Sequence, residues 1–222
     1  MKEVVAMRLT CEDVCFSYGK GRNWRINREF CGGTTYQLIG PNGSGKSTIG
    51  KVLTRIESPQ QGVIAVDGRS AGDMTRAELL STFLYVPQEP QWLFFGESFC
   101  KSMRWFNRKS RVCGDGVGDG ADGPGKDEIM DEVTRMGSAS VFELSSGDVF
   151  LLALFELHVW IRPIAFIDEY PDFDDPAHQA FVAAILQKRE KSGLITFIAR
   201  HMLADIGSNN GRTLYMDEMV AI

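Results

Sequence analysis

One short segment, Gly40 to Ser47, constrains this chain more than any other. It reads GPNGSGKS and fits the pattern G-x-x-x-x-G-K-[ST] of a phosphate-binding loop. Gly43 and Gly45 allow the backbone to bend so that successive N–H groups face the β- and γ-phosphates of a nucleotide. Lys46 brings a cation to the same phosphates, and the Ser47 hydroxyl is a ligand for Mg²⁺. The residues predicted to bind the nucleotide here are Asn42, Gly43, Ser44, Gly45, Lys46, Ser47 and Thr48.

The sequence on both sides of this loop has the order that the motif requires. Residues 35–39 predict a strand before the loop, and the apolar spacing of residues 47–56 predicts a helix after it. The N-terminus of that helix adds its positive dipole end to the phosphate site. A chance glycine-rich turn would lack this context, so we interpret the segment as a nucleotide site.

The composition excludes several other classes of protein. A chain of 222 residues with 44% hydrophobic residues is long enough for one globular domain with a core. The net charge is −5 and basic residues do not cluster, so nucleic acid is not expected as a partner. The five cysteines form no C-x-x-C pair, which predicts free thiols in a reducing compartment. The longest apolar run, 149–155, is too short to span a membrane, so any membrane association is expected to go through a partner.

Short apolar runs alternate with helical patterns along the chain, which predicts an α/β fold with a mainly parallel central sheet. Further strands are predicted at residues 7–18 (one strand or a hairpin), 62–66, 83–86, 164–167, 194–199 and 213–216. Helices are predicted at 76–80, 98–106, 126–136, 148–160 and 177–190, and an irregular glycine-rich connection at 114–125. We expect a single domain over residues 1–222, with a core at about 1–88 and 148–222 and an inserted helical lobe at about 89–147.

A pair of acidic residues, Asp168 and Glu169, directly follows the predicted strand 164–167. In a phosphate-loop ATPase, Asp168 would hold Mg²⁺, through water, and Glu169 would polarise the attacking water. A solvated turn would also explain two acids at a strand end. The phosphate-binding loop in the same chain favours the catalytic interpretation.

Several short motifs in one fixed order make the chain resemble the ATP-binding cassette (ABC) ATPases, the nucleotide-binding subunits of ABC transporters. The resemblance extends from Tyr18 to His201, nearly the whole chain. The motifs that carry it are Tyr18, Gly40 to Thr48, Gln88, Leu144 to Asp148, Asp168 with Glu169, Asp175, and His201. The fold that this resemblance implies is a P-loop NTPase core with an antiparallel β subdomain and an inserted helical subdomain.

The resemblance also implies a role for each motif. Tyr18 is similar to the aromatic residue that stacks on adenine, although it could equally be an ordinary aromatic at a strand end. Gln88 is similar to the glutamine that ligates Mg²⁺ and senses the transmembrane partner. His201 is similar to the switch histidine that contacts the γ-phosphate, and Asp175 to the aspartate that couples the two sites of a dimer. Leu144 to Asp148 is similar to the signature motif, which acts on the ATP of the opposite subunit.

The signature segment can be interpreted from its own residues as well. Ser145 offers a hydroxyl, Gly147 offers an unobstructed N–H, and a helix is expected to begin directly after Gly147, which makes an anion site. Such a site serves a phosphate that arrives from another chain, so a dimer with a second ATP-binding subunit, identical or different, is expected. The segment departs from the usual Leu-Ser-Gly-Gly-Gln at Ser146 and Asp148.

Together these features predict an ATP hydrolase that uses ATP and Mg²⁺ and powers an ABC transporter through ATP-driven dimerisation. Transmembrane transporter subunits are expected as partners, and the cytoplasmic face of the membrane as the location. The expected catalytic residues are Lys46, Glu169 and His201, the metal ligands are Ser47, Gln88 and Asp168, and the signature residues are Ser145, Gly147 and Asp148. Two alternatives stay open: a soluble ABC-type ATPase outside transport, and a nucleotide-gated interaction module with weak turnover, which the altered signature favours.

Overall fold

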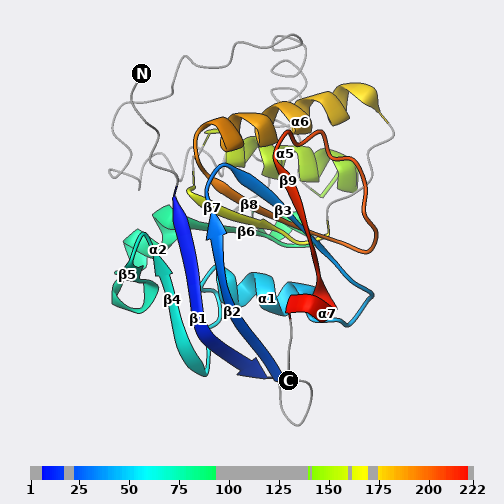
Figure 1. Ribbon diagram of the computed structural model, residues 1–222. Coiled ribbons are helices and arrows are strands. Elements are labelled where there is room, and N and C mark those ends of the chain that lie inside the picture. The colour runs from blue at the N-terminus through cyan, green and yellow to red at the C-terminus, as the bar shows by residue number, and fades with distance from the viewer. Residues whose placement is uncertain are drawn as a thin grey trace. The chain divides into compact units, whose positions relative to one another are not determined.

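The computed structural model describes residues 7–17, 23–93, 140, 142–159, 162–169 and 175–219 (Figure 1). Tyr18, the helices expected at 98–106 and 126–136, and the connection at 114–125 lie outside these residues. The chain divides into two compact units. The first comprises Met1–Gln88, Arg162–Tyr170 and Leu186–Ile222, and the second comprises Glu89–Ile161 and Pro171–Ile185.

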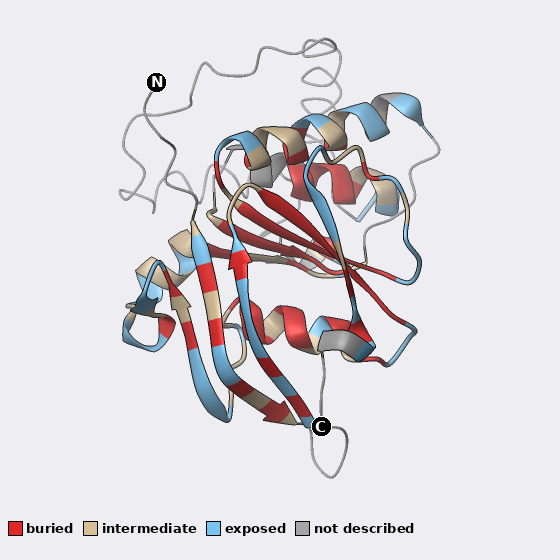
Figure 2. Ribbon diagram, viewed as in Figure 1, coloured by how far each residue is buried: buried red, intermediate tan, exposed pale blue. Residues whose placement is uncertain are grey.

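The first unit contains a four-stranded antiparallel sheet. Its strands are β1 (Arg8–Ser17), β2 (Asn23–Cys31), β4 (Gln61–Val66) and β5 (Arg69–Ser70), in the order β2-β1-β4-β5. Buried and exposed residues alternate along β1 and β2, as expected for a sheet with one face on the core (Figure 2). The pairing of β1 with β2 shifts register between Cys11 and Val14, where Asp13 has a φ of 48°. The strand β2 was not predicted from the sequence.

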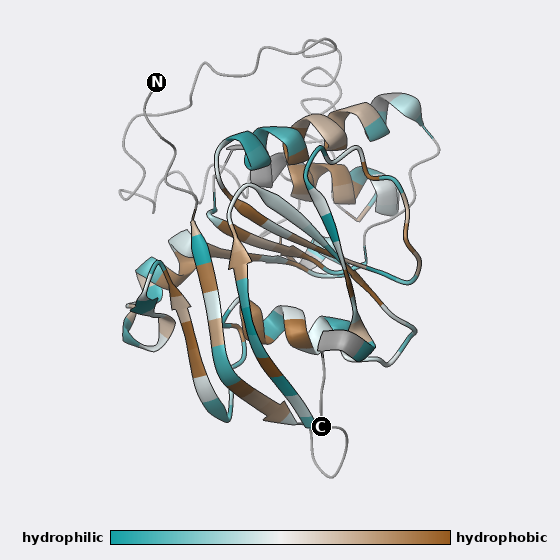
Figure 3. Ribbon diagram, viewed as in Figure 1, coloured by the Kyte–Doolittle hydropathy of each residue, from teal (hydrophilic) through white to brown (hydrophobic). Residues whose placement is uncertain are grey.

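The first unit also contains a five-stranded sheet in which every neighbouring pair is parallel. Its strands are β3 (Thr34–Ile39), β6 (Phe83–Val86), β7 (Ile164–Ile167), β8 (Ile195–Arg200) and β9 (Gly211–Tyr215), in the order β6-β7-β8-β3-β9. β3, β7 and β8 are buried at every position, and Figure 3 shows β7 and β8 as largely hydrophobic. These short apolar runs are typical of strands covered on both faces, so the predicted α/β class is confirmed.

One hydrophobic cluster joins the two sheets to helix α1 (Lys46–Leu53). Aromatic rings form its centre: Phe30 meets Tyr36 and Phe197 edge to face, at centroid distances of 5.2 Å and 4.9 Å. α1 ends earlier than the sequence suggested. Arg55 has a φ of 61°, and this left-handed residue stops the helix before residue 56.

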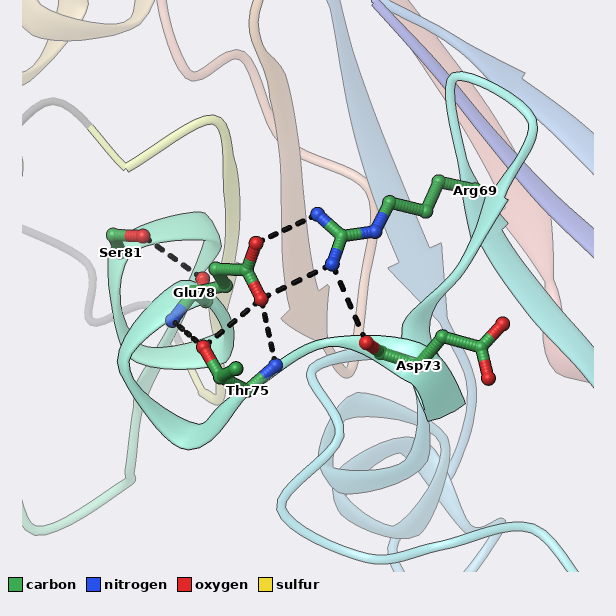
Figure 4. Close-up of polar contacts among 5 residues, drawn as sticks. All are labelled: Arg69, Asp73, Thr75, Glu78 and Ser81. Carbon is green, nitrogen blue, oxygen red and sulfur yellow. Dashed lines mark hydrogen bonds and ion pairs between the residues drawn. The ribbon is translucent and has the colours of Figure 1, made fainter.

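A polar network fixes helix α2 (Arg76–Thr82), which leads directly into β6. Thr75 and Glu78 form a capping box, in which each side chain accepts a hydrogen bond from the other residue's backbone N–H (Figure 4). The Arg69 guanidinium donates to both oxygens of Glu78, at 2.7 Å and 3.1 Å. This contact ties α2 to the antiparallel sheet, after the short 3-10 helix Ala71–Asp73.

The described part of the second unit consists of the 3-10 helix Pro90–Leu93, helix α5 (Ser146–Val159) and the first part of α6 (Pro176–Lys191). α5 is apolar, and its residues 149–154 are buried. It begins at Ser146 and not after Gly147, because Ser145 caps it: the backbone N–H of Asp148 donates to the Ser145 hydroxyl at 3.1 Å. Within the described ranges, none of the helices combines the length and the hydropathy that a membrane crossing needs.

Candidate nucleotide site

The carboxyl ends of the parallel strands bring most of the predicted site residues to one edge of the sheet. The phosphate-binding loop follows β3, Gln88 follows β6, Asp168 and Glu169 follow β7, and His201 follows β8. Val86 pairs with Ile167, so β6 and β7 end level, and Ile39 pairs with Arg200, so β3 and β8 end level. Ile167 pairs with Ile198, so β8 continues two residues beyond the end of β7. In open parallel sheets, ligands bind outside this edge. The expected clustering therefore follows from strand order and register.

The phosphate-binding loop has the backbone conformation that its glycines permit. Gly43 and Gly45 have φ angles of 72° and 100°, in the region that side chains disfavour. Gly45 is the residue before α1, whose first N–H groups therefore face the loop. The indole of Trp24, from β2, lies against Gly45: a Cβ atom there would stand 2.7 Å from its Cζ2 atom. Trp24 itself stacks on Phe16 with a centroid distance of 5.4 Å.

Lys46 lies beneath the loop, with a relative exposure of 5%. Its Nζ donates to the backbone oxygens of Gly40 at 2.7 Å and Pro41 at 3.0 Å. Burial lowers the pKa of Lys46, whereas the negative charges of Glu169 and Asp168 act in the opposite direction. The ammonium group is thus buried within the field of both acidic residues.

Asp168 is 4% exposed, and its two carboxylate oxygens have different surroundings. Oδ2 accepts a hydrogen bond of 2.6 Å from the Tyr85 hydroxyl. Oδ1 is buried and has no hydrogen-bond partner among the residues that the structure describes. A buried carboxylate oxygen without a partner is costly, and a hard cation such as Mg²⁺ prefers such a ligand. Asp168 therefore fits a magnesium site.

Glu169 and His201 form a pair on the exposed side of this edge. The Nε2 atom of His201 lies 2.9 Å from Oε1 of Glu169, and the two side chains are 43% and 29% exposed respectively. Glu169 has a φ of 56°, in the left-handed region. Solvent therefore reaches the carboxylate that was predicted to polarise water, and this carboxylate contacts the His201 imidazole.

A cavity of about 780 Å³ opens beside the loop. It is lined by residues of four regions: Asn23 and Trp24 from β2, Ile39 at the end of β3 with Gly40, Pro41 and Ser44 of the loop, His201, and the segment Tyr215 to Asp217. Its volume is in the range of small-molecule sites. The Ser44 hydroxyl oxygen borders it and has no hydrogen-bond partner within the described part of the chain.

Some predicted residues lie elsewhere or are not described. Ser145, Gly147 and Asp148 belong to the second unit, at the start of α5. Tyr18 lies outside the described residues. Asn42, Ser47 and Gln88 are described and exposed, and Thr48 is half-buried. Trp24 and Tyr85 were not predicted as site residues; they contact Gly45 and Asp168 respectively.

These features define a phosphate-loop ATPase: a glycine loop between a buried strand and a helix, a buried lysine, and two acids at the end of another strand of the same parallel sheet. A match to a family model identifies the family within this class. The model described as "ABC transporter" matches residues 24–170, so the chain belongs to this family, and it is an ATP-binding and ATP-hydrolysing domain of the ABC type. The predicted family, fold and enzyme class are confirmed.

Individual relatives agree. The β-(1→2)glucan export ATP-binding/permease protein NdvA of Nitrobacter winogradskyi is 30% identical over 90% of this chain and 33% of its own length. The probable multidrug resistance ABC transporter ATP-binding/permease protein YheH of Bacillus subtilis is 28% identical over 98% of this chain and 32% of its own length. This chain thus spans about a third of the length of these relatives.

Solved structures show the same fold. One is cbiO1 from Clostridium perfringens, part of the ABC transporter complex cbiONQ, with a TM-score of 0.68, 21% identity, and coverage of 96% of this chain and 86% of that one. Another is the ATP-binding cassette MJ0796 in a dimeric post-hydrolysis state bound to ADP and Pi, with a TM-score of 0.71, 18% identity and coverage of 96% of both chains.

Proposed function

We propose that this chain binds Mg-ATP at the carboxyl edge of its parallel sheet, hydrolyses it, and powers a transporter by closing a dimer around the nucleotide. The observation that carries the proposal is the grouping of Lys46, Asp168 and Glu169: Lys46 begins the helix after β3, and both acids directly follow β7 in the same parallel sheet. Both carboxylates also act to raise the pKa of the buried ammonium. Structural ion pairs also perturb pKa values. Here, however, the lysine lies beneath a glycine loop whose backbone N–H groups can receive a phosphate.

Each residue has a defined task in this proposal. Lys46 exchanges its bonds to the loop carbonyls for bonds to the phosphates. Ser47, Gln88 and Asp168 would hold Mg²⁺, which would neutralise charge on the phosphate oxygens when bound. Glu169 accepts a proton from the attacking water, and His201 holds the Glu169 carboxylate in place.

The partners follow from the same proposal. The Ser145–Asp148 segment would face the ATP of a second subunit, which is either another copy of this chain or a different one. A membrane-spanning partner at the cytoplasmic face is supported by the relatives, whose names join an ATP-binding part to a permease. The partner could recognise the exposed Gln88.

Glu169→Gln tests the hydrolytic assignment. The amide keeps the shape of the side chain but cannot accept a proton, so ATP binding should persist while turnover falls by about 10²-fold or more. ATP binding is measured by calorimetry, turnover by phosphate release, and dimer formation by light scattering with Mg-ATP. Lys46→Ala is the matched control and should lose binding as well as turnover. A Glu169→Gln variant that hydrolyses ATP at the wild-type rate would overturn the assignment.

A second candidate function is a nucleotide-gated interaction module with weak turnover. Ser146 and Asp148 in the signature favour it, because Asp148 places a negative charge at the start of α5, near where a partner's phosphate would bind. Steady-state ATPase activity separates the two candidates. Substantial turnover by the purified chain with its natural partner would exclude the module.

A further inference from the structure

Tyr85 lies at a position from which its hydroxyl reaches the acidic end of the neighbouring strand. It pairs with Phe166 in the register of β6 and β7, and the two rings stack at a centroid distance of 5.8 Å. Asp168 is two residues beyond Phe166, on the same face of the sheet. A tyrosine is long enough to bridge this diagonal, and its hydroxyl donates to Oδ2 of Asp168 at 2.6 Å.

The backbone of Asp168 is held as firmly as its side chain. Its N–H donates to the carbonyl of Val86 at 2.8 Å, which continues the pairing of β6 with β7 past the last strand residue. With the backbone fixed and Oδ2 bonded to Tyr85, the orientation of the carboxylate is determined. Oδ1 is then the oxygen left for a ligand, and it is the one without a partner in the described part of the chain.

We propose that Tyr85 is a positioning residue for the divalent cation of the nucleotide site: its hydroxyl occupies Oδ2 of Asp168 and so presents Oδ1 to the cation. This inference rests on the proposed function, because it assumes that Asp168 serves a Mg-nucleotide. A hydrogen bond to one oxygen of a ligating carboxylate orients the other oxygen and keeps the group from turning to a second donor. Mutation of such an outer partner typically lowers metal affinity or activity by about 10–100-fold.

Tyr85→Phe isolates the hydroxyl, since phenylalanine retains the stacking on Phe166. The probe is the non-hydrolysable analogue AMP-PNP, with affinity measured by calorimetry in EDTA and in MgCl₂. We expect wild-type protein to bind AMP-PNP more tightly with Mg²⁺. In Tyr85→Phe the ratio of the AMP-PNP affinity in MgCl₂ to that in EDTA should be about tenfold smaller than in wild type. The affinity in EDTA should stay within about twofold of wild type. Mn²⁺ binding to the nucleotide-loaded protein, followed by electron paramagnetic resonance, should weaken in parallel.

Tyr36→Phe is the matched control. The Tyr36 hydroxyl also makes part-buried hydrogen bonds in the first unit. Its partners are the backbone N–H and carbonyl of Cys31, at 2.8 Å and 3.4 Å, and not Asp168 or Glu169. Its removal should lower thermal stability and leave the gain from Mg²⁺ unchanged. Both variants therefore lose a tyrosine hydroxyl bond, and only one of them loses the contact with Asp168.

The outcomes separate the inference from the function that it assumes. An unchanged or larger Mg²⁺ gain in Tyr85→Phe overturns the inference, the larger gain meaning that the hydroxyl competes with the cation. An equal loss of affinity in EDTA and in Mg²⁺ also overturns it, because the effect is then on folding. Wild-type protein that binds no AMP-PNP under either condition overturns the proposed function, and this inference with it.

Discussion

Replacing Gly45 by alanine should destabilise the first unit, and two separate costs contribute. The φ of 100° places any side chain in an unfavourable backbone region, at about 1–2 kcal/mol. The added Cβ would also stand 2.7 Å, 2.8 Å and 2.9 Å from the Trp24 atoms Cζ2, Cε2 and Nε1, where contact requires the indole to move. Overpacking of a fitted site costs about 1–3 kcal/mol. Gly45→Ala should therefore lower the free energy of unfolding by about 2–5 kcal/mol.

A double-mutant cycle with Trp24→Leu separates the two costs. Leucine removes the atoms that the new Cβ would meet, so in this background Gly45→Ala should cost only the backbone part, about 1–2 kcal/mol. The coupling free energy between the two positions is then about 1–3 kcal/mol. Urea unfolding followed by far-ultraviolet circular dichroism measures it, because the Trp24 substitution alters fluorescence.

Gly43→Ala is the control for this cycle. Gly43 also has a positive φ, of 72°, but a Cβ atom there meets nothing within 4 Å. Gly43→Ala should lower the free energy of unfolding by about 1–2 kcal/mol. This loss should be the same in the wild-type and Trp24→Leu backgrounds. If Gly45→Ala cost the same in both backgrounds as well, the indole would not restrict the loop, and the argument from its distance to Gly45 would be wrong.

Two further predictions concern pH and thiol reactivity. The Arg69 guanidinium, and then the Thr75 backbone N–H and hydroxyl, lower the pKa of Glu78 from an ordinary 4.5 to about 2. Because the folded pKa is depressed, the ionised Glu78 should stabilise the fold above pH 4.5, and this stabilisation should be lost as the pH falls toward about 2. Glu78→Gln should therefore make the free energy of urea unfolding depend less on pH between pH 4.5 and about 2. Burial raises the pKa of the Cys11 thiol to about 12, whereas Cys31 is exposed, so iodoacetamide at neutral pH should modify Cys31 well before Cys11 in peptide mapping by mass spectrometry. Equal labelling would mean that β1 opens readily.

The sequence predicted the strands that are buried on both faces and missed β2, which is buried on one face, and the two-residue β5. β7 is a continuous apolar run, and β8 is apolar except at Thr196 and Arg200, which is typical of strands inside a parallel sheet. β2 buries only Trp24, Ile26 and Phe30 and exposes charged residues between them. Its regular alternation is interrupted before Phe30, and a pattern of period two was therefore hard to see.

The same distinction applies to the site. Lys46, Asp168 and Glu169 are parts of motifs that are contiguous in sequence, so their chemistry could be predicted without a structure. Tyr85 and Trp24 act through contacts between strands far apart in the chain. Whether a tyrosine on β6 reaches an acid after β7 depends on which strands are neighbours and in which register, and neither is visible in a single sequence.

The left-handed backbone of Glu169 allows a test in which the sign of the result is decisive. Glu169→Gly and Glu169→Ala both remove the contact with His201, so they differ only in the backbone. In an ordinary conformation, alanine is the more stable by about 0.4–1 kcal/mol, because glycine gives the unfolded chain more freedom. At the φ of 56° seen here, alanine carries a penalty of about 1–2 kcal/mol that glycine avoids.

The glycine variant should therefore unfold at the higher urea concentration. Its free energy of unfolding should exceed that of the alanine variant by up to about 1.5 kcal/mol. An alanine variant that is the more stable of the two would mean that residue 169 adopts an ordinary backbone in solution. If glycine is favoured, the chain retains a strained glutamate where glycine would be easier. Strained residues cluster at functional sites, and the strained Glu169 brings its carboxylate to His201, at the edge where the nucleotide is proposed to bind.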